Sequence, residues 1–264
     1  AGDSVFIPFT GSARAVYRFA QQGKKVTCSD VQPFVSSLVH TLIGKGSTDV
    51  NVDSVEPMKG WLYNNRHFKA TDALAVYIDG YATAYANKHF AKAMLGCAIT
   101  NSTFRGYLGG FIVDNVDEFK KILTQAQRRL QKYHGSCPNV DFHLTSFSDV
   151  DIQKADIVFI DPPKVVSDTD VYSTGYRGLN ATLDQKDPEL DAWTSKGYTD
   201  RFACLDNIDA KKWLFIYTTD VNPPLNEIVD YLERKGATRC VNNYTMSKRC
   251  DYLFEVNLHK SEQF

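Results

Sequence analysis

One short stretch, Asp156 to Lys164 (DIVFIDPPK), constrains the fold more than any other part of the sequence. Its apolar centre predicts a buried strand, and the two prolines predict that this strand stops abruptly. Proline has no backbone N–H and a fixed φ, so the carbonyl groups of Asp161 and Pro162 are rigid hydrogen-bond acceptors. In open α/β sheets, ligands lie just outside the carboxyl ends of strands. A carboxylate beside a rigid carbonyl suits an amino group there, although a plain proline turn with a solvated aspartate fits the same residues.

The first 30 residues have the order of a nucleotide-binding βαβ unit. Their apolar patterns predict a strand, a helix and a strand, over residues 4–9, 14–20 and 24–28. The small residues of the turn between the first strand and the helix allow a ligand to approach the backbone closely, and Asp30 after the second strand suits ribose hydroxyl groups. Only Gly11 is a glycine in this turn, since Ala13 stands where a second is expected. A turn that merely packs the helix on the sheet therefore stays open as an alternative.

Apolar periodicity divides the remaining chain into further helices and strands. Helical patterns cover residues 31–43, 72–98, 116–133 and 225–235, and strand patterns cover residues 140–144, 156–160, 213–217, 238–244 and 252–258. Residues 44–60 are polar and predict a surface segment. Residues 100–111, a mix of Gly, Arg, Asn and aromatic residues, predict a loop that suits either a binding surface or an ordinary connection. The polar, aromatic segment between Lys164 and Trp213 predicts a lid or binding loop.

Composition excludes several classes of protein. A chain of 264 residues with 43% hydrophobic residues can bury a core and is not disordered. Its net charge of -1 gives no general attraction to nucleic acid, so a nucleic-acid surface would have to be local. The six cysteines show neither CxxC nor zinc-finger spacing, which predicts reduced thiols, a cytoplasmic location and no metal site. We find no signal peptide and no apolar run of the ~20 residues that a membrane span needs. The first residue, Ala1, indicates a processed amino terminus or a leading segment outside this sequence.

Short motifs follow one another along the chain in an informative order. They are Pro8-Phe9-Thr10-Gly11, the acid Asp30, Asn-x-x-Phe-x-Gly at residues 101–106, Ser146-Phe147, Asp161-Pro162-Pro163, and a closing strand, basic turn and strand around Lys248-Arg249. In this order they resemble the Dam-like, alpha-type DNA adenine N6-methyltransferases. The resemblance implies an α/β, Rossmann-like S-adenosylmethionine-dependent methyltransferase fold with an inserted, mainly helical substrate-recognition region. Residues 1–50 and 136–264 would form the catalytic domain, and residues 51–135 the inserted target-recognition region.

The resemblance also implies a set of cofactor-binding residues. These are Pro8, Phe9, Gly11, Ala13, Asp30, Ser146, Phe147 and Asp161. The turn after the first strand would surround the methionine part of S-adenosylmethionine, and Asp30 would hold its ribose. Phe147 would lie against the cofactor's adenine. Ser146 stands where the family usually has an acid that holds the amino group of that adenine.

The implied catalytic residues are Asp161, Pro162, Pro163 and Lys164. Asp161 and the Pro162 carbonyl would accept hydrogen bonds from the amino group of the target adenine and aim its nitrogen lone pair at the sulfonium methyl group. Such chemistry depends on positioning more than on a strong base, and the resemblance implies neither a metal nor a covalent nucleophile. The family has a stacking aromatic where this chain has Lys164, which cannot form the same flat surface.

The implied partner is double-stranded DNA with a flipped adenine, bound by a monomer. Candidate nucleic-acid contacts are Asn101, Arg105, Tyr172, Tyr176, Lys248 and Arg249. Arg105 and the basic turn would contact phosphates, against the alternative of ordinary exposed basic residues. Tyr172 or Tyr176 would take the place of the missing aromatic.

Other functions compete to different degrees. Cytosine C5 methylation needs a Pro-Cys nucleophile, and the chain has only the reverse order, Cys137-Pro138. Hydride transfer is disfavoured because the first turn lacks GxGxxG. An RNA base methyltransferase is a better alternative, because Asp-Pro-Pro-Lys also resembles a motif of some ribosomal RNA methyltransferases. The Asn101 to Gly106 region, inserted between the cofactor turn and Asp161, favours the DNA enzyme over it. A non-catalytic, nucleic-acid-binding relative of the same fold stays open, and cofactor binding would separate it from an enzyme.

Overall fold

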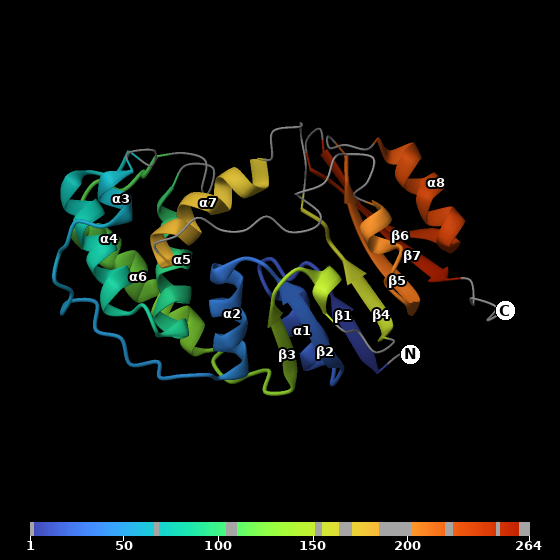
Figure 1. Cartoon of the computed structure of the whole chain (residues 1–264), viewed down its shortest axis with the longest axis horizontal. Helices are drawn as coiled ribbons and strands as arrows, with labels where there is room; N and C mark the ends of the chain where they lie inside the picture. Colours follow the sequence, from blue (N-terminus) through green and yellow to red (C-terminus); the bar gives the residue numbers. More distant parts are fainter. Residues whose placement is uncertain are drawn as a thin grey trace. The chain divides into compact units, whose positions relative to one another are not determined.

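A computed structural model of the chain describes residues 3–65, 69–103, 110–150, 155–163, 171–184, 202–219, 224–246 and 249–258 (Figure 1). The chain divides into two compact units. Unit 1 comprises Ala1–Asp30, Asn139–Tyr172 and Leu190–Phe264, and unit 2 comprises Val31–Pro138 and Ser173–Glu189. The family resemblance assigns catalysis to residues 1–50 and 136–264 and target recognition to residues 51–135. These assignments describe function, so the division into two compact units does not test them, and they stay a prediction.

Unit 1 is built on a seven-stranded sheet with the order β3-β2-β1-β4-β5-β7-β6 (Figure 1). The strands are β1 (Ser4–Ile7), β2 (Lys25–Asp30), β3 (Val140–Leu144), β4 (Ala155–Ile160), β5 (Ala210–Thr218), β6 (Gly236–Met246) and β7 (Arg249–Leu258). Strands β1 to β5 are parallel, and β7 pairs antiparallel with both β5 and β6. The predicted α/β class and the positions of the predicted strands are confirmed.

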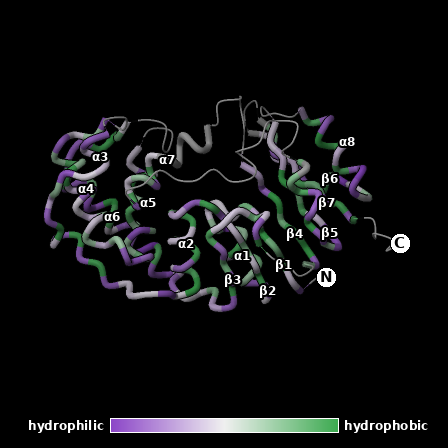
Figure 2. The backbone as a smooth tube through the Cα atoms, viewed as in Figure 1, coloured by the Kyte–Doolittle hydropathy of each residue, from purple (hydrophilic) through white to green (hydrophobic). Residues whose placement is uncertain are grey.

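Burial explains why the central strands are apolar. Val5, Phe6 and Ile7 of β1 are at most 1% exposed, as expected for a parallel strand covered on both faces. Helix α1 (Arg14–Gln21) follows β1, and helix α8 (Leu225–Lys235) buries Ile228 and Leu232 in the core of unit 1. Hydrophilic and hydrophobic residues alternate along α8, which is the pattern of a helix with one face inward (Figure 2).

The strand order reverses at β1. The chain passes from β1 to β2 and β3 on one side, and β4 and β5 lie on the other side. Because β1 and β4 are parallel neighbours, their carboxyl ends meet at one edge of the sheet. This is the switch point at which open α/β sheets bind ligands.

The opposite ends of these two strands are tied together by Asp156. One oxygen of its carboxylate accepts hydrogen bonds from the backbone N–H groups of Asp3 and Ser4, at 2.9 and 3.1 Å, and from the Ser4 hydroxyl at 3.0 Å. Its other oxygen lies 2.5 Å from the Nζ atom of Lys211 on β5. These contacts align the amino ends of three adjacent strands.

Unit 2 is helical in its described part. Its helices are α2 (Pro33–Ile43), α3 (Trp61–Asn64), α4 (Asp72–Ala84), α5 (His89–Ser102), α6 (Val116–Gln131) and most of α7 (Val171–Asp184). The predicted helical stretch 72–98 is therefore two helices, and α6 agrees with its prediction. Helices α2 and α5 approach closely at Gly96, where an added Cβ would lie 2.2 Å from the Phe34 ring.

Two predictions about loops are wrong. Residues 171–184, predicted as part of a lid or binding loop, form α7, because Leu179 and Leu183 lie one turn apart and both are buried. The buried Asn180 between them accepts a hydrogen bond from the Phe34 N–H at 3.1 Å and donates to the side chain of Gln32. Residues 100–102, predicted as loop, form the last turn of α5. In both helices tertiary packing outweighs weak local periodicity.

Candidate active site

The turn that follows β1 is fixed to the end of β2 by buried hydrogen bonds. Thr10 is 4% exposed, and its backbone N–H and hydroxyl both donate to the Ser29 carbonyl oxygen, at 3.2 and 2.8 Å. The Ser29 hydroxyl donates to the Pro8 carbonyl oxygen at 3.3 Å. Buried polar groups are costly unless paired, so this set of bonds holds the turn in one conformation. Sequence patterns do not reveal these roles of Thr10 and Ser29, since pairing of β1 with β2 is what brings the partners near.

Gly11 leaves open space beside the turn. Its φ of +53° lies in the left-handed region that favours glycine, and an added Cβ would meet no other atom within 4 Å. Its N–H donates to Oδ2 of Asp30 at 3.0 Å, and Asp30 is 9% exposed. The turn therefore presents backbone beside a carboxylate at the carboxyl ends of two adjacent strands.

Ala13, at the position where the sequence pattern predicts a second glycine, has a left-handed backbone. It is the N-cap of α1 with a φ of 58°, and no side chain caps this helix end. A left-handed backbone costs a residue with a Cβ about 1–2 kcal/mol. Strain of this kind is often retained at functional sites, and here it lies two residues from Gly11.

Phe147 and Ser146 follow β3 on the other side of β2. The Phe147 ring contacts the Phe9 ring edge to face, with centroids 5.1 Å apart, and only 3% of Phe147 is exposed. The half-buried Ser146 has its hydroxyl 2.9 Å from that of Ser148. Two predicted cofactor residues, Phe9 and Phe147, are thus brought together, although their rings belong mainly to the core of unit 1.

Asp161, Pro162 and Pro163 leave the sheet directly after β4. Asp161 is exposed, Pro162 is half-buried and Pro163 is buried. Because β4 lies next to β1, this segment and the Gly11 turn leave the sheet at the same edge, as the sequence predicts. Ile160, the last residue of β4, is fully buried and anchors the segment.

The remaining predicted residues are placed only in part. Asn101 is exposed in the last turn of α5, in unit 2. Tyr172 and Tyr176 are residues of α7, and Arg249 is the first residue of β7. Lys164, Arg105 and Lys248 lie outside the described residues.

Cys28 lies on β2, the strand that ends at Asp30. Burial raises the pKa of the Cys28 thiol to about 12, with the negative charges of Asp30 and Asp141 acting in the same direction. Cys28 is therefore a neutral core residue at ordinary pH rather than a nucleophile.

In the described part of the chain, no three His, Cys, Asp or Glu side chains gather as they would around a metal ion. None of the helices described is both long and apolar enough to cross a membrane.

Comparison with known proteins agrees with this arrangement. A family model described as D12 class N6 adenine-specific DNA methyltransferase matches residues 2–192, which is more than half of the chain. A comparison with curated proteins gave no significant match. The family description names DNA rather than RNA, and the predicted Rossmann-like methyltransferase fold is confirmed. Since the match spans the Gly11 turn, Asp30, Phe147 and the Asp161-Pro162-Pro163 segment, the chain belongs to the family of D12 class N6 adenine-specific DNA methyltransferases.

Proposed function

We propose that this chain transfers a methyl group from S-adenosylmethionine to the N6 amino group of an adenine that has been flipped out of a DNA duplex. Family membership establishes adenine N6 methylation of DNA. The cofactor, the flipped base and the roles of single residues are proposed. One observation carries them: the Gly11 turn, which donates to Asp30, leaves the sheet at the same edge as Asp161-Pro162-Pro163.

The residues at the switch point fit S-adenosylmethionine. The open space at Gly11 would admit a ligand against the backbone. A carboxylate has about four acceptor positions, so Asp30 can receive the Gly11 N–H and ribose hydroxyl groups together. Asp30 and Asp161 also suit a ligand with positively charged groups. Bound there, S-adenosylmethionine supplies an electrophilic methyl group.

Asp161 and Pro162 would hold the target amino group. The Asp161 carboxylate and the Pro162 carbonyl are acceptors on a segment whose φ angles are restricted by two prolines. Two hydrogen bonds from the amino group to these acceptors would orient its nitrogen lone pair. Positioned polar groups of this kind lower the barrier because they need no rearrangement during the reaction.

DNA binding would involve both units. Unstacking a base costs a few kcal/mol, which contacts in the pocket must repay. We propose that residues 51–135 recognise the target sequence, and that Asn101, Arg105, Tyr172, Tyr176, Lys248 and Arg249 contact the nucleic acid. Lys164 stands where the family has a stacking aromatic, and Tyr172 or Tyr176 would supply that ring. The active species is proposed to be a monomer.

Replacing Asp161 tests the proposed chemistry directly. Asp161→Ala is expected to abolish transfer of radioactive methyl groups to adenine-containing DNA. Its affinity for S-adenosylmethionine, measured by calorimetry, should stay within a few-fold of the wild-type value, because the other cofactor residues remain. Mass spectrometry of the digested DNA identifies the product as N6-methyladenine.

Asp230→Ala provides a matched control, since Asp230 is exposed on α8 of the same unit. This variant should methylate DNA as the wild type does. Full activity of Asp161→Ala would refute the role of Asp161. Absence of cofactor binding by the wild type would instead favour the non-catalytic relative, and labelling of RNA but not DNA would refute the proposed substrate.

A further inference from the structure

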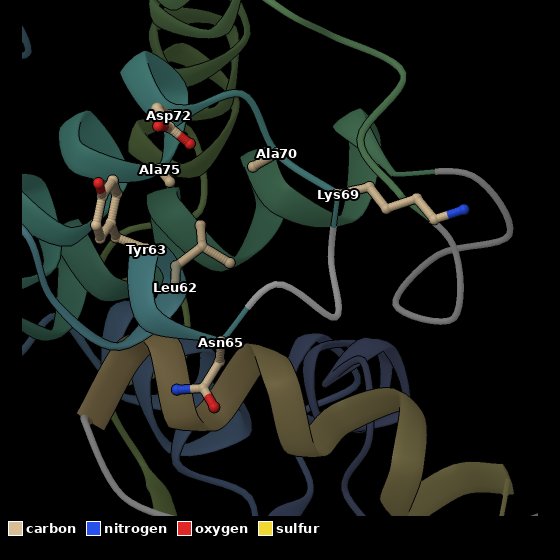
Figure 3. Close-up of a pocket in the computed structure, with 7 residues that line it drawn as sticks. All are labelled: Leu62, Tyr63, Asn65, Lys69, Ala70, Asp72 and Ala75. Atoms are coloured by element: carbon tan, nitrogen blue, oxygen red, sulfur yellow. The ribbon is translucent and has the colours of Figure 1, made fainter.

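A pocket of about 240 Å³ lies in unit 2 between α3 and the first turns of α4 (Figure 3). Its floor is apolar and buried, with Leu62 and Ala75 each 4% exposed. Its rim is polar and consists of Tyr63, Asn65, Lys69 and Asp72. Pockets for drug-sized ligands measure roughly 300–1,000 Å³, so this one suits a single ring system rather than a large cofactor.

A buried carboxylate fixes the wall of this pocket. Asp79 of α4 is fully buried and accepts hydrogen bonds from the N–H groups of Gly60, Leu62 and Tyr63, at 3.0, 3.0 and 2.9 Å. A helix of four residues such as α3 is not stable alone, because the free-energy cost of nucleating a helix exceeds the stabilisation from the hydrogen bonds of one turn. The hydrogen bonds to Asp79 therefore hold α3 in place and fix the position of the Tyr63 backbone. At Gly60 an added Cβ would lie 2.8 Å from the Asp79 carboxyl carbon, so this close approach requires glycine.

Lys69 combines a strained backbone with an ammonium group that no described residue engages. Its φ is +43°, in the left-handed region that L-residues other than glycine rarely adopt. Its Nζ atom forms neither a hydrogen bond nor an ion pair with any residue in the described ranges, and the side chain is exposed. In Figure 3 the ammonium points outward from the pocket, away from Tyr63. Such strain at a charged, unengaged residue points to a ligand.

These features together match the chemistry of a nucleotide. A base has flat apolar faces, which suit Leu62 and the Tyr63 ring, over which the Lys59 ammonium lies 4.7 Å from the ring centroid. The polar edge of a base suits the Asp72 carboxylate and the amide oxygen of Asn65, whose NH2 group donates to the Trp61 carbonyl oxygen at 2.9 Å. A phosphate outside the pocket would meet the ammonium of Lys69. Aromatic rings and cations together are how proteins bind unstacked nucleotides.

We propose that this pocket binds one unstacked nucleotide of the DNA substrate, with the base in the cavity and its phosphate at Lys69. The pocket belongs to unit 2, whereas Gly11, Asp30 and Asp161 belong to unit 1, and the proposal rests on the target-recognition role of residues 51–135. It names a specificity site in that region, where Asn65 and Asp72 would select among bases.

Fluorescence anisotropy with labelled duplexes tests this site. The duplexes carry one bulged thymine, which has no amino group for Asp161, or an abasic residue at the same place. The wild type should bind the bulged duplex more tightly than the abasic one. Tyr63→Ala should weaken binding of the bulged duplex roughly 5- to 150-fold and remove the difference between the two. Free thymidine monophosphate as a competitor shows whether the pocket also takes nucleotides outside DNA.

The Lys69 variants separate a binding role from a structural one. Lys69→Gln should lower the slope of log affinity against log salt concentration by about one, as expected for one lost phosphate contact. Lys69→Gly should weaken binding similarly, yet its melting temperature should equal or exceed that of the wild type, because glycine relieves the left-handed strain. Lys121→Gln removes an exposed lysine from α6 of the same unit and should leave the salt slope unchanged.

Two outcomes would overturn the proposal. One is equal affinity of the wild type for bulged and abasic duplexes. The other is a wild-type salt slope and wild-type affinity in both Lys69 variants. Methylation of DNA by the wild type, measured in the same preparations, keeps these results separate from the proposed function, because methyl transfer can be present while the pocket binds nothing.

Discussion

Among single residues, Asp30 has a structural role in the Gly11 turn and a proposed role in cofactor binding, and substitutions can separate the two. Its carboxylate accepts the Gly11 N–H, which shapes the turn, and it is proposed to accept ribose hydroxyl groups as well. Asp30→Asn keeps an acceptor for Gly11 but loses the charge. We expect its unfolding free energy to stay within about 0.5 kcal/mol of the wild type, while the KM for S-adenosylmethionine rises about tenfold or more.

Asp30→Ala is the companion variant, because it leaves the half-buried Gly11 N–H without this acceptor. Its unfolding free energy in urea should fall by about 1–3 kcal/mol in addition to the change in KM. An unchanged KM in Asp30→Asn would show that Asp30 only shapes the turn. Equal losses of stability in both variants would show that charge, rather than the hydrogen bond, holds the turn.

Among helices, α7 is held to unit 2 by Asn180. Its side chain accepts from the Phe34 N–H and donates to Gln32, and Asn180 is fully buried. Asn180→Ala would remove the acceptor of the Phe34 N–H and the donor to Gln32, and the loss of the buried acceptor alone costs about 1–3 kcal/mol, so we expect unit 2 to lose at least about 1–3 kcal/mol in urea unfolding. Gln32→Ala should cost less by itself. Combined with Asn180→Ala it should add little, since the two variants share one contact. Fully additive losses would contradict this coupling.

Helix α7 is an element that the sequence alone does not predict. Helices α6 and α8 and strand β3 are predictable because each has a strong apolar period and clear ends, such as the Asn115 side chain that accepts from the Glu118 N–H before α6. In α7 the sequence looks polar because Asn180 and Thr182 are buried with their polar groups paired: Asn180 bonds to Gln32 and Phe34 at the start of α2, and the Thr182 hydroxyl donates to the Gly178 carbonyl within α7. The same limit applies to the site. Strand ends place Gly11, Asp30 and Asp161 at one edge, whereas the Thr10 and Ser29 bonds depend on strand pairing.

Acid is expected to act unequally on the two units. In unit 2, the Nδ1 atoms of His40 and His89 lie 3.3 Å apart between α2 and α5. Burial lowers the pKa of His40 to about 4, and His89 and Lys45 add to this effect; burial also lowers the pKa of His89. In unit 1, hydrogen bonds from Lys211, and then from Ser4 and Asp3, hold the pKa of Asp156 well below its usual range.

The two shifts destabilise the fold in different pH ranges. A histidine whose pKa falls from 6.5 to about 4 on folding contributes stability above pH 6.5 that is lost as the pH falls toward 4, because the unfolded chain binds the proton more tightly. The contribution of Asp156 is complete above its unfolded value of 3.8 and is lost only in stronger acid. Hydrogen-exchange protection, taken relative to the intrinsic exchange rate at each pH, should therefore fall in α2 and α5 between pH 6.5 and 4, before it does in β1 and β4. His40→Gln should make the stability of α2 and α5 depend less on pH between 6.5 and 4. His143→Gln, a substitution on β3 of unit 1, should leave this pH dependence unchanged. If α2 and α5 keep full protection down to pH 4, the histidine pair does not control the stability of unit 2.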